Sequence, residues 1–149
     1  MDQISFDWSL ITSNLILMSA AYVLALPIAW NRETNARSAG LRTYPMVALA
    51  TCAMMLIGIK VLSSTGAESR VMQAIITGMG FIGGGAILKS GRQITGLATA
   101  SSLWATGAMG IAVAWQRFEI AVLLSVMTFA TLQFVSPAKK LVNGDDESD

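Results

Sequence analysis

The sequence lacks several of the residue types on which common catalytic and metal-binding sites depend. Among 149 residues there is no histidine, and Cys52 is the single cysteine. A zinc site, a Ser-His or Cys-His catalytic pair and an internal disulfide each need residues that are missing here. The sequence also has no phosphate-binding loop. We therefore expect no enzymatic activity, no cofactor and no metal site.

The acidic residues are placed unfavourably for a magnesium pathway. Magnesium prefers oxygen ligands, usually one or two carboxylates together with water. Ion-coupled transporters usually carry a charge inside the membrane. All 19 charged residues of this chain lie outside five uncharged stretches, which cover residues 8–31, 43–59, 71–88, 93–116 and 120–138. This pattern argues against a conduit for divalent cations.

One candidate site is a group of glycines and other small residues between 78 and 110. Gly80 and Gly84 have the spacing at which two membrane helices approach closely, and small residues recur at every fourth position from 98 to 114. This predicts packing within the chain, with a second copy or with another membrane protein. The run 83–85 weakens a helix by ~1 kcal/mol per glycine, so an unwound segment lining a cavity is the alternative. The predicted contact residues are Gly78, Gly80, Gly83, Gly84, Gly85, Ser102, Thr106 and Gly110.

A second candidate site combines basic and hydroxyl residues near the ends of the uncharged stretches. Thr43 and Thr99 each lie near the start of a predicted helix, close to arginines. A helix N-terminus beside arginines favours anions such as lipid phosphates, whereas the arginines could equally serve topology alone. The residues of this predicted polar or anion-binding pocket are Arg32, Glu33, Arg42, Thr43, Arg70, Gln73, Arg92, Thr95, Thr99, Ser101 and Trp104.

The elements that would position these residues are membrane-spanning helices. A helix that crosses a bilayer needs about 20 mostly apolar residues, and the five uncharged stretches fit that length. The short alternating segments of a closed barrel are missing. We predict an all-α polytopic integral membrane protein, with one five-span domain at 1–135 and a polar, acidic tail at 136–149. The predicted spans are about 8–30, 44–62, 71–88, 96–115 and 118–135.

The basic residues predict the orientation of the spans. Seven lie in the segments on one side and three on the other, so the positive-inside rule predicts an outer N-terminus and a cytoplasmic C-terminal tail. The net charge of +1 does not indicate a nucleic-acid partner. The partners we expect are the lipid bilayer, a second copy in a homo-oligomer such as a dimer or another membrane protein, and a bound phospholipid.

Three motifs resemble those of the MgtC/SapB family of bacterial inner-membrane proteins. They are Gly-Met-Gly-Phe-Ile-Gly-Gly-Gly-Ala-Ile-Leu-Lys at 78–89, Thr-Gly-Leu-Ala-Thr-Ala-Ser-Ser-Leu-Trp at 95–104, and Ala-Gly-Leu-Arg-Thr at 39–43. The resemblance extends over roughly 25–132. The sequence departs from the family pattern at Asn31, where an acid is usual, and at Gln73-Ala74, where the order is reversed.

The resemblance implies a five-span protein of the bacterial inner membrane, linked to survival at low magnesium and, in pathogens, to virulence inside macrophages. The best-known member is thought to act as a regulator of a partner, the proton-driven ATP synthase. Members have also been regarded as magnesium transporters, which leaves transport of magnesium or another small solute through the glycine-rich segment as the alternative. Many members carry a C-terminal ACT-like domain, and we expect this chain to be a short form without it.

Overall fold

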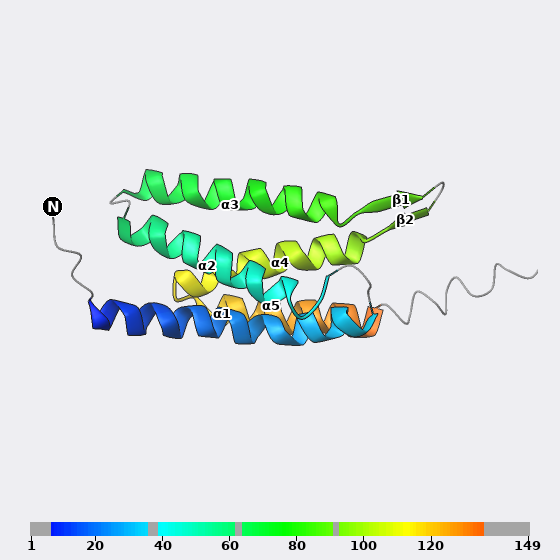
Figure 1. Cartoon of the computed structure of the whole chain (residues 1–149), viewed down its shortest axis with the longest axis horizontal. Helices are drawn as coiled ribbons and strands as arrows, with labels where there is room; N and C mark the ends of the chain where they lie inside the picture. Colours follow the sequence, from blue (N-terminus) through cyan, green and yellow to red (C-terminus); the bar gives the residue numbers. More distant parts are fainter. Residues whose placement is uncertain (1–6, 36–38, 62–63, 91–92, 136–149) are drawn as a thin grey trace, which may run out of the picture.

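The computed structural model describes residues 7–35, 39–61, 64–90 and 93–135, which form a bundle of helices with one short hairpin (Figure 1). The strands β1 (Leu88–Ser90) and β2 (Gln93–Thr95) pair antiparallel, with Lys89 opposite Ile94. The all-α prediction is confirmed for the body of the chain, whereas the hairpin was not predicted. The helical elements are α1 (Trp8–Asn35), α2 (Thr43–Val61), α3 (Thr65–Gly85), α4 (Leu97–Ala114), α5 (Phe118–Ala130) and the π-helical turn η1 (Thr131–Val135).

Helix α4 lies at the centre of the bundle and contacts the four other α-helices. Of the residues in its membrane-length window, α4 has 61% buried. The corresponding windows of α1 and of α5 with η1 each have 17% buried. Thr106, Met109 and Val113 are completely buried. Because many α4 residues are small, the neighbouring backbones can approach closely. Helix α3 packs against α2 and α4 on the outside of the bundle (Figure 1).

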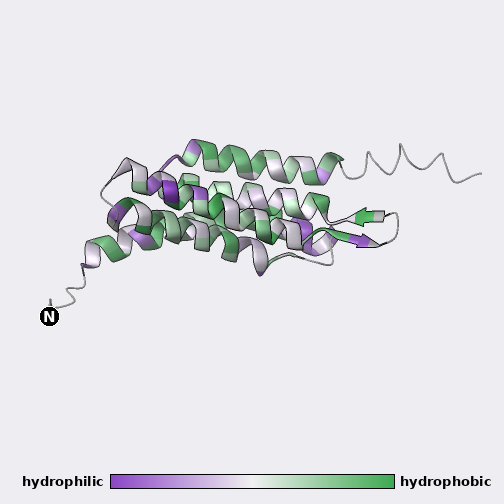
Figure 2. Ribbon diagram, turned by 90° about the horizontal axis from the view of Figure 1, so that it is seen from above, coloured by the Kyte–Doolittle hydropathy of each residue, from purple (hydrophilic) through white to green (hydrophobic). Residues whose placement is uncertain are grey.

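In the part of the chain that the structure describes, four helical segments are long and apolar enough to cross a membrane: α1, α2, α4, and α5 together with η1. In Figure 2, hydrophobic residues run along the helices and strongly hydrophilic ones gather toward the ends. The predicted third span, 71–88, is the exception. Helix α3 begins at Thr65, where the Ser64 side chain accepts a hydrogen bond from the Ala67 N–H, so Glu68 and Arg70 lie inside it. With these charges inside it, α3 is not among the segments that are apolar over a full membrane length.

The first helix is longer than its predicted span. It continues past residue 30 to Asn35, because residues 31–35 contain neither the proline nor the glycine that would end a helix. Asn31 and Arg32 therefore lie on the buried face of α1 and not in a loop. This extension brings two polar side chains into the bundle.

Gly96 sets the start of α4. Its φ of 87° lies in the left-handed region, which strains any residue with a side chain. A Cβ atom at this position would also lie 2.9 Å from the carbonyl carbon of Ala86. The glycine therefore lets the chain turn from β2 into α4 and places Thr99 in the first turn of that helix.

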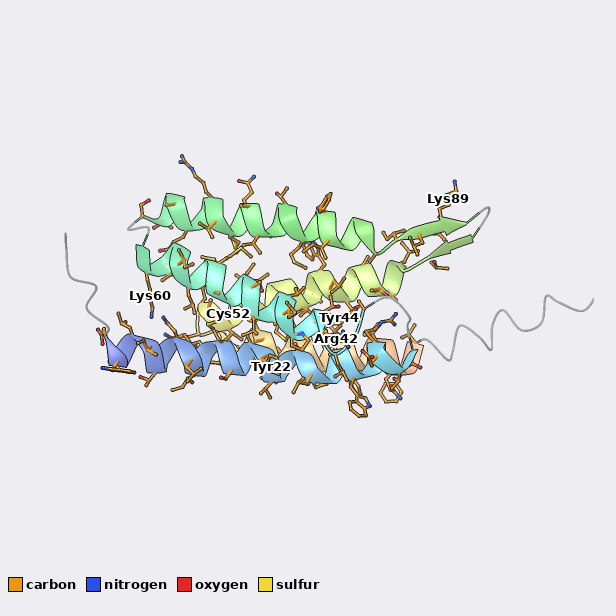
Figure 3. The ribbon with its side chains drawn as sticks, in the orientation of Figure 1. Tyr22, Arg42, Tyr44, Cys52, Lys60 and Lys89 are labelled. Atoms are coloured by element: carbon orange, nitrogen blue, oxygen red, sulfur yellow. The ribbon has the colours of Figure 1, made fainter. Side chains whose placement is uncertain are left out.

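The charged residues divide between the two ends of the bundle. Arg42 and Lys89 lie at one end and Lys60 lies at the other (Figure 3). This separation agrees with the grouping that underlies the predicted orientation. The orientation itself and the domain bounds stay predictions. Arg92 and the predicted tail 136–149 lie outside the described residues.

Candidate polar site at one end of the bundle

Four polar side chains meet inside the bundle where α1 ends and where α2 and α4 begin. Arg32 on α1 donates a hydrogen bond from Nη2 to the Thr99 hydroxyl of α4, over 2.8 Å. The Tyr44 hydroxyl of α2 lies 2.6 Å from the Ser102 hydroxyl of α4. Tyr44 also lies close enough to Arg32 to interact with its charge. We call Arg32, Tyr44, Thr99 and Ser102 the Arg32 cluster.

The Arg32 cluster is buried, although it contains a charge. The exposed fraction is 8% for Arg32, 1% for Thr99 and 3% for Ser102. A charged side chain is rarely buried without a partner of opposite charge, because losing its hydration costs on the order of several kcal/mol. Within the described ranges the one ion pair joins Arg117 to Glu119, both exposed. Arg32 therefore has no counter-charge in the part of the chain that the structure describes.

The hydrogen bonds of the cluster leave an excess of donors. The Ser102 hydroxyl has the carbonyl oxygens of Ala98 and Thr99 within reach, over 2.7 and 3.0 Å, and the Tyr44 hydroxyl can donate to Ser102 or to the Thr99 carbonyl. Among the described residues, Arg32 Nε has no acceptor. The Thr99 hydroxyl accepts from Arg32 and finds no acceptor for its own hydrogen within the same ranges. A group that supplies acceptors and negative charge would satisfy both donors.

A second polar contact lies beside the cluster and joins α1 to η1. Asn31 Nδ2 donates to Gln133 Oε1 over 2.7 Å, and Asn31 is 3% exposed. The π-helical turn η1 carries Gln133, and such turns are frequent at functional sites. Sequence reasoning missed Asn31, Tyr44 and Gln133 as site residues. The sequence did contain a signal for these three residues, since each has an amide or hydroxyl group and lies within an apolar stretch or at its end.

Only part of the predicted pocket comes together at this site. Arg32 and Thr99 are in direct contact. Glu33 is exposed, and its carboxylate accepts the backbone N–H of Leu41 over 2.8 Å. Arg42 is exposed and Thr43 half-buried at the start of α2. The acid nearest to Arg32 in the sequence is thus engaged with the segment before α2.

Several predicted pocket residues lie elsewhere. Arg70 and Gln73 are exposed in the first half of α3, and α3 runs so that this half lies toward the end of the bundle away from the β-hairpin (Figure 1). Thr95 is exposed in β2. Trp104 lines a hollow of about 150 Å³ between α3 and α4. Ser101 is exposed on α4, in a groove described below.

The predicted contact residues of α4 pack inside this chain. Ser102, Thr106 and Gly110 are buried. A Cβ atom on Gly110 would lie 2.6 Å from the Ala48 carbonyl oxygen of α2. These residues are therefore not available as a contact surface for a second protein, because α2 already occupies that face of α4.

The predicted contact glycines of α3 are mostly open. A Cβ atom on Gly83 would lie 3.5 Å from the Ala100 carbonyl oxygen of α4. At Gly78, Gly80, Gly84 and Gly85 an added Cβ would meet no atom within 4 Å. The helix is continuous to Gly85, so the glycine run is helical and not unwound.

Two hollows on the surface border these elements. One, of about 500 Å³, lies between α2 and α3 and is almost entirely apolar. The other, of about 370 Å³, lies between α4 and the α5–η1 segment, and its lining includes Ser101, Ser102, Thr128 and Thr131. No group of three or more His, Cys, Asp or Glu that could hold a metal ion occurs in the described ranges.

The fold and the site define a helical membrane protein with a buried arginine at one end of its bundle. The chain belongs to the MgtC family, whose model matches residues 18–141. No solved structure matches the chain.

Three relatives illustrate the similarity. The chain is 31% identical to an uncharacterized protein of Synechocystis, over 92% of this chain and 57% of that protein. It is 30% identical to the "Putative magnesium transporter YhiD" of Escherichia coli K12, over 80% of this chain and 59% of that protein. It is 32% identical to the protein MgtC of Brucella abortus, over 70% of this chain and 43% of that protein. The chain thus spans about half the length of these relatives.

Proposed function

We propose that this bacterial membrane protein takes part in adaptation to low magnesium without catalysis, by packing the open face of α3 against a second helix. That helix belongs to another copy of the chain or to another protein of the inner membrane. The proton-driven ATP synthase is the partner that the family resemblance suggests. The proposal rests on one observation, the combination of glycines and an amide on an exposed helix face.

The open face of α3 is unsuited to lipid. Gln73, Thr77, Gly80 and Gly84 are exposed and follow one another at helical spacing. The hydrocarbon core offers no hydrogen-bond partner to an amide, whereas a neighbouring helix can supply one and can approach closely at glycines. A second helix on this face would therefore satisfy Gln73 and cover the glycines.

The proposal is tested by crosslinking from α3 in membranes. Cys52 is buried and is the single cysteine, so a Cys52→Ala background allows a photo-crosslinker to be attached through Phe81→Cys, at an 86%-exposed position of α3 beside Gly80. A matched control carries the label through Val126→Cys, at a 59%-exposed position of α5. We expect adducts from position 81 and not from position 126, at low magnesium more than at high magnesium. The adduct mass distinguishes a second copy from another protein.

A bulky residue at position 84 provides the complementary test and should act only on association. Gly84→Leu is expected to abolish association in detergent without affecting membrane insertion, because among the described residues no other part of the chain lies within 4 Å of an added Cβ. Association that survives Gly84→Leu, together with equal adducts from positions 81 and 126, would contradict the proposal.

Transport of magnesium or another small solute through the glycine-rich segment is the second candidate. It is favoured by the name of the Escherichia coli relative, which calls that protein a magnesium transporter. Liposomes that contain the protein and a magnesium-sensitive dye would separate the two functions. Flux above that of empty liposomes, lost in Arg70→Ala or Thr99→Val, would support transport. We expect no such flux.

A further inference from the structure

We propose that the Arg32 cluster is a binding site for a phosphate group, which reaches it as the headgroup of an anionic phospholipid or as free phosphate. This site is separate from the open face of α3, and the proposal does not depend on the function proposed above. It rests on a buried guanidinium whose donors and charge are not fully matched by the surrounding residues that the structure describes.

The unmatched donors, Arg32 Nε and the Thr99 hydroxyl, are buried within the Arg32 cluster. Arg32 is more than nine-tenths buried, and its Nε atom has no acceptor among the described residues. The Thr99 hydroxyl, 2.8 Å from the guanidinium, has a free hydrogen within the same ranges. A phosphate group presents several acceptor oxygens and negative charge, and Arg binds it through more than one N–H.

The start of α4 adds further donors at this point. The first intrahelical bond of α4 runs from the Ala100 N–H to the Gly96 carbonyl, and no side chain of the described ranges caps the helix. The N–H groups of the first turn, which includes Thr99, therefore lack partners within the helix. The positive end of the helix and the charge of Arg32 favour the same kind of ligand, an anion.

The neighbouring amides are compatible with such a ligand. Asn31 Nδ2 donates to Gln133 Oε1, which leaves Asn31 Oδ1 without a donor among the described residues. Exchanging nitrogen and oxygen in both amides preserves this hydrogen bond. The exchange turns the unpartnered Asn31 atom into an N–H donor. An anion beside Arg32 would favour this arrangement.

The groove between α4 and α5 fits the lipid source of the phosphate. Ser102 belongs both to the Arg32 cluster and to the lining of the 370 Å³ groove, which also includes the hydroxyl residues Ser101, Thr128 and Thr131. The groove lies between two helical segments of membrane length, α4 and α5 with η1. A phospholipid could place its glycerol and phosphate among these hydroxyls and its chains along the helices.

The site is tested by ligand-dependent unfolding of the full chain in phosphate-free, non-ionic detergent. The unfolding temperature is measured against increasing inorganic phosphate and, separately, against short-chain phosphatidylglycerol, at constant ionic strength. We expect a saturable rise with at least one probe. Arg32→Gln should weaken binding at least about tenfold, because a charge-assisted contact is lost. Arg42→Gln removes an exposed arginine at the same end and should leave binding unchanged. A response to phosphate alone identifies the free anion, and a response to the lipid alone identifies the headgroup.

Two further variants address folding. Without ligand, Arg32→Gln should unfold at a higher temperature than the natural chain, because a buried unpaired charge has been removed. If this variant does not fold, Thr99→Val keeps the shape of the side chain and removes one donor, and should weaken binding several-fold. No shift of the natural chain with either probe would overturn the proposal. So would unchanged affinity in folded Arg32→Gln or Thr99→Val.

Discussion

Helices α3 and α4 both contain glycines, yet Gly110 of α4 and most glycines of α3 have opposite environments. In α4, Gly110 lies against α2 so closely that an added Cβ would come within 2.6 Å of a backbone carbonyl oxygen. In α3, Gly80 and Gly84 have no neighbouring atom within 4 Å of such a Cβ. The same residue type therefore allows close packing inside the chain in one helix and leaves an open surface on the other.

The two helices also differ in their hydrogen bonds to neighbours. Helix α4 is bonded to α1 through Arg32 and Thr99 and to α2 through Tyr44 and Ser102. Among the described residues, the side-chain hydroxyls of α3 bond only to its own backbone, as Thr77 does to the Gln73 carbonyl. The bundle is thus held together around α4, while α3 is the helix with unused contacts.

The largest effect should come from filling a glycine of α4. Gly110→Leu would push side-chain atoms into the Ala48 carbonyl and Thr51, neither of which can move without displacing α2. We expect a loss of about 3 kcal/mol in the free energy of unfolding. Denaturant titration in detergent micelles measures it. Gly84→Leu is the matched control, and equal losses in both variants would remove the contrast between the helices.

A smaller effect is expected from the hydrogen bonds of α4. Tyr44→Phe deletes the hydroxyl that lies 2.6 Å from Ser102 in a buried site. Ser102 keeps its own bonds to backbone carbonyls, so the loss should be about 1 kcal/mol. Tyr22→Phe, at a 41%-exposed position of α1, should be neutral. A neutral Tyr44→Phe in the same titration would show that the cluster adds no stability.

Filling a glycine of α3 should act in the opposite direction. Gly84→Ala introduces a methyl group into open space and replaces the weakest helix former after proline. We expect a gain of about 0.8 kcal/mol for the isolated chain. The gain is measured by thermal unfolding at low protein concentration, where association is minimal. A clear loss under those conditions would mean that α3 already packs on this face.

The smallest effect should come from a bond on the opposite side of the bundle. Ser125 on α5 donates to the Leu24 carbonyl of α1 over 2.7 Å. Hydrogen bonds between membrane helices contribute about 0.6 kcal/mol on average, so Ser125→Ala should destabilise by that amount. Thr131→Ala removes a hydroxyl bonded within its own helical segment and is the control in the same unfolding measurement. If the two variants behave alike, the bond between helices contributes nothing.

Much of the fold followed from the spacing of charges. The uncharged stretches correctly located four of the membrane-length helices, because each excludes the residues that are costly in lipid. The third stretch, 71–88, did not locate the start of its helix. Helix α3 begins at Thr65 and includes Glu68 and Arg70, because the Ser64 cap is a local signal that a count of charges does not include.

The candidate site was predictable only in part. Arg32 and Thr99 were both proposed as pocket residues, and they are in contact. Their partner Tyr44 was not proposed, because an aromatic residue at the end of an apolar stretch also fits the membrane interface. Arg70 and Gln73 were placed in the same pocket. Because α3 runs antiparallel to α4, Arg70 and Gln73 lie toward the end of the bundle away from the start of α4 (Figure 1).

The sequence alone determined that this is a helical membrane protein of the MgtC type, because uncharged stretches of span length and three ordered motifs are properties of the chain itself. Only the tertiary structure decided which small residues are used within the chain and which charge is buried without a counter-charge among the described residues. The reason is that the spacing of glycines, or an arginine at the end of an apolar stretch, does not specify which residues of the fold will pack against it. The neighbours of Gly84, Gly110 and Arg32 are set by how five helices pack around α4.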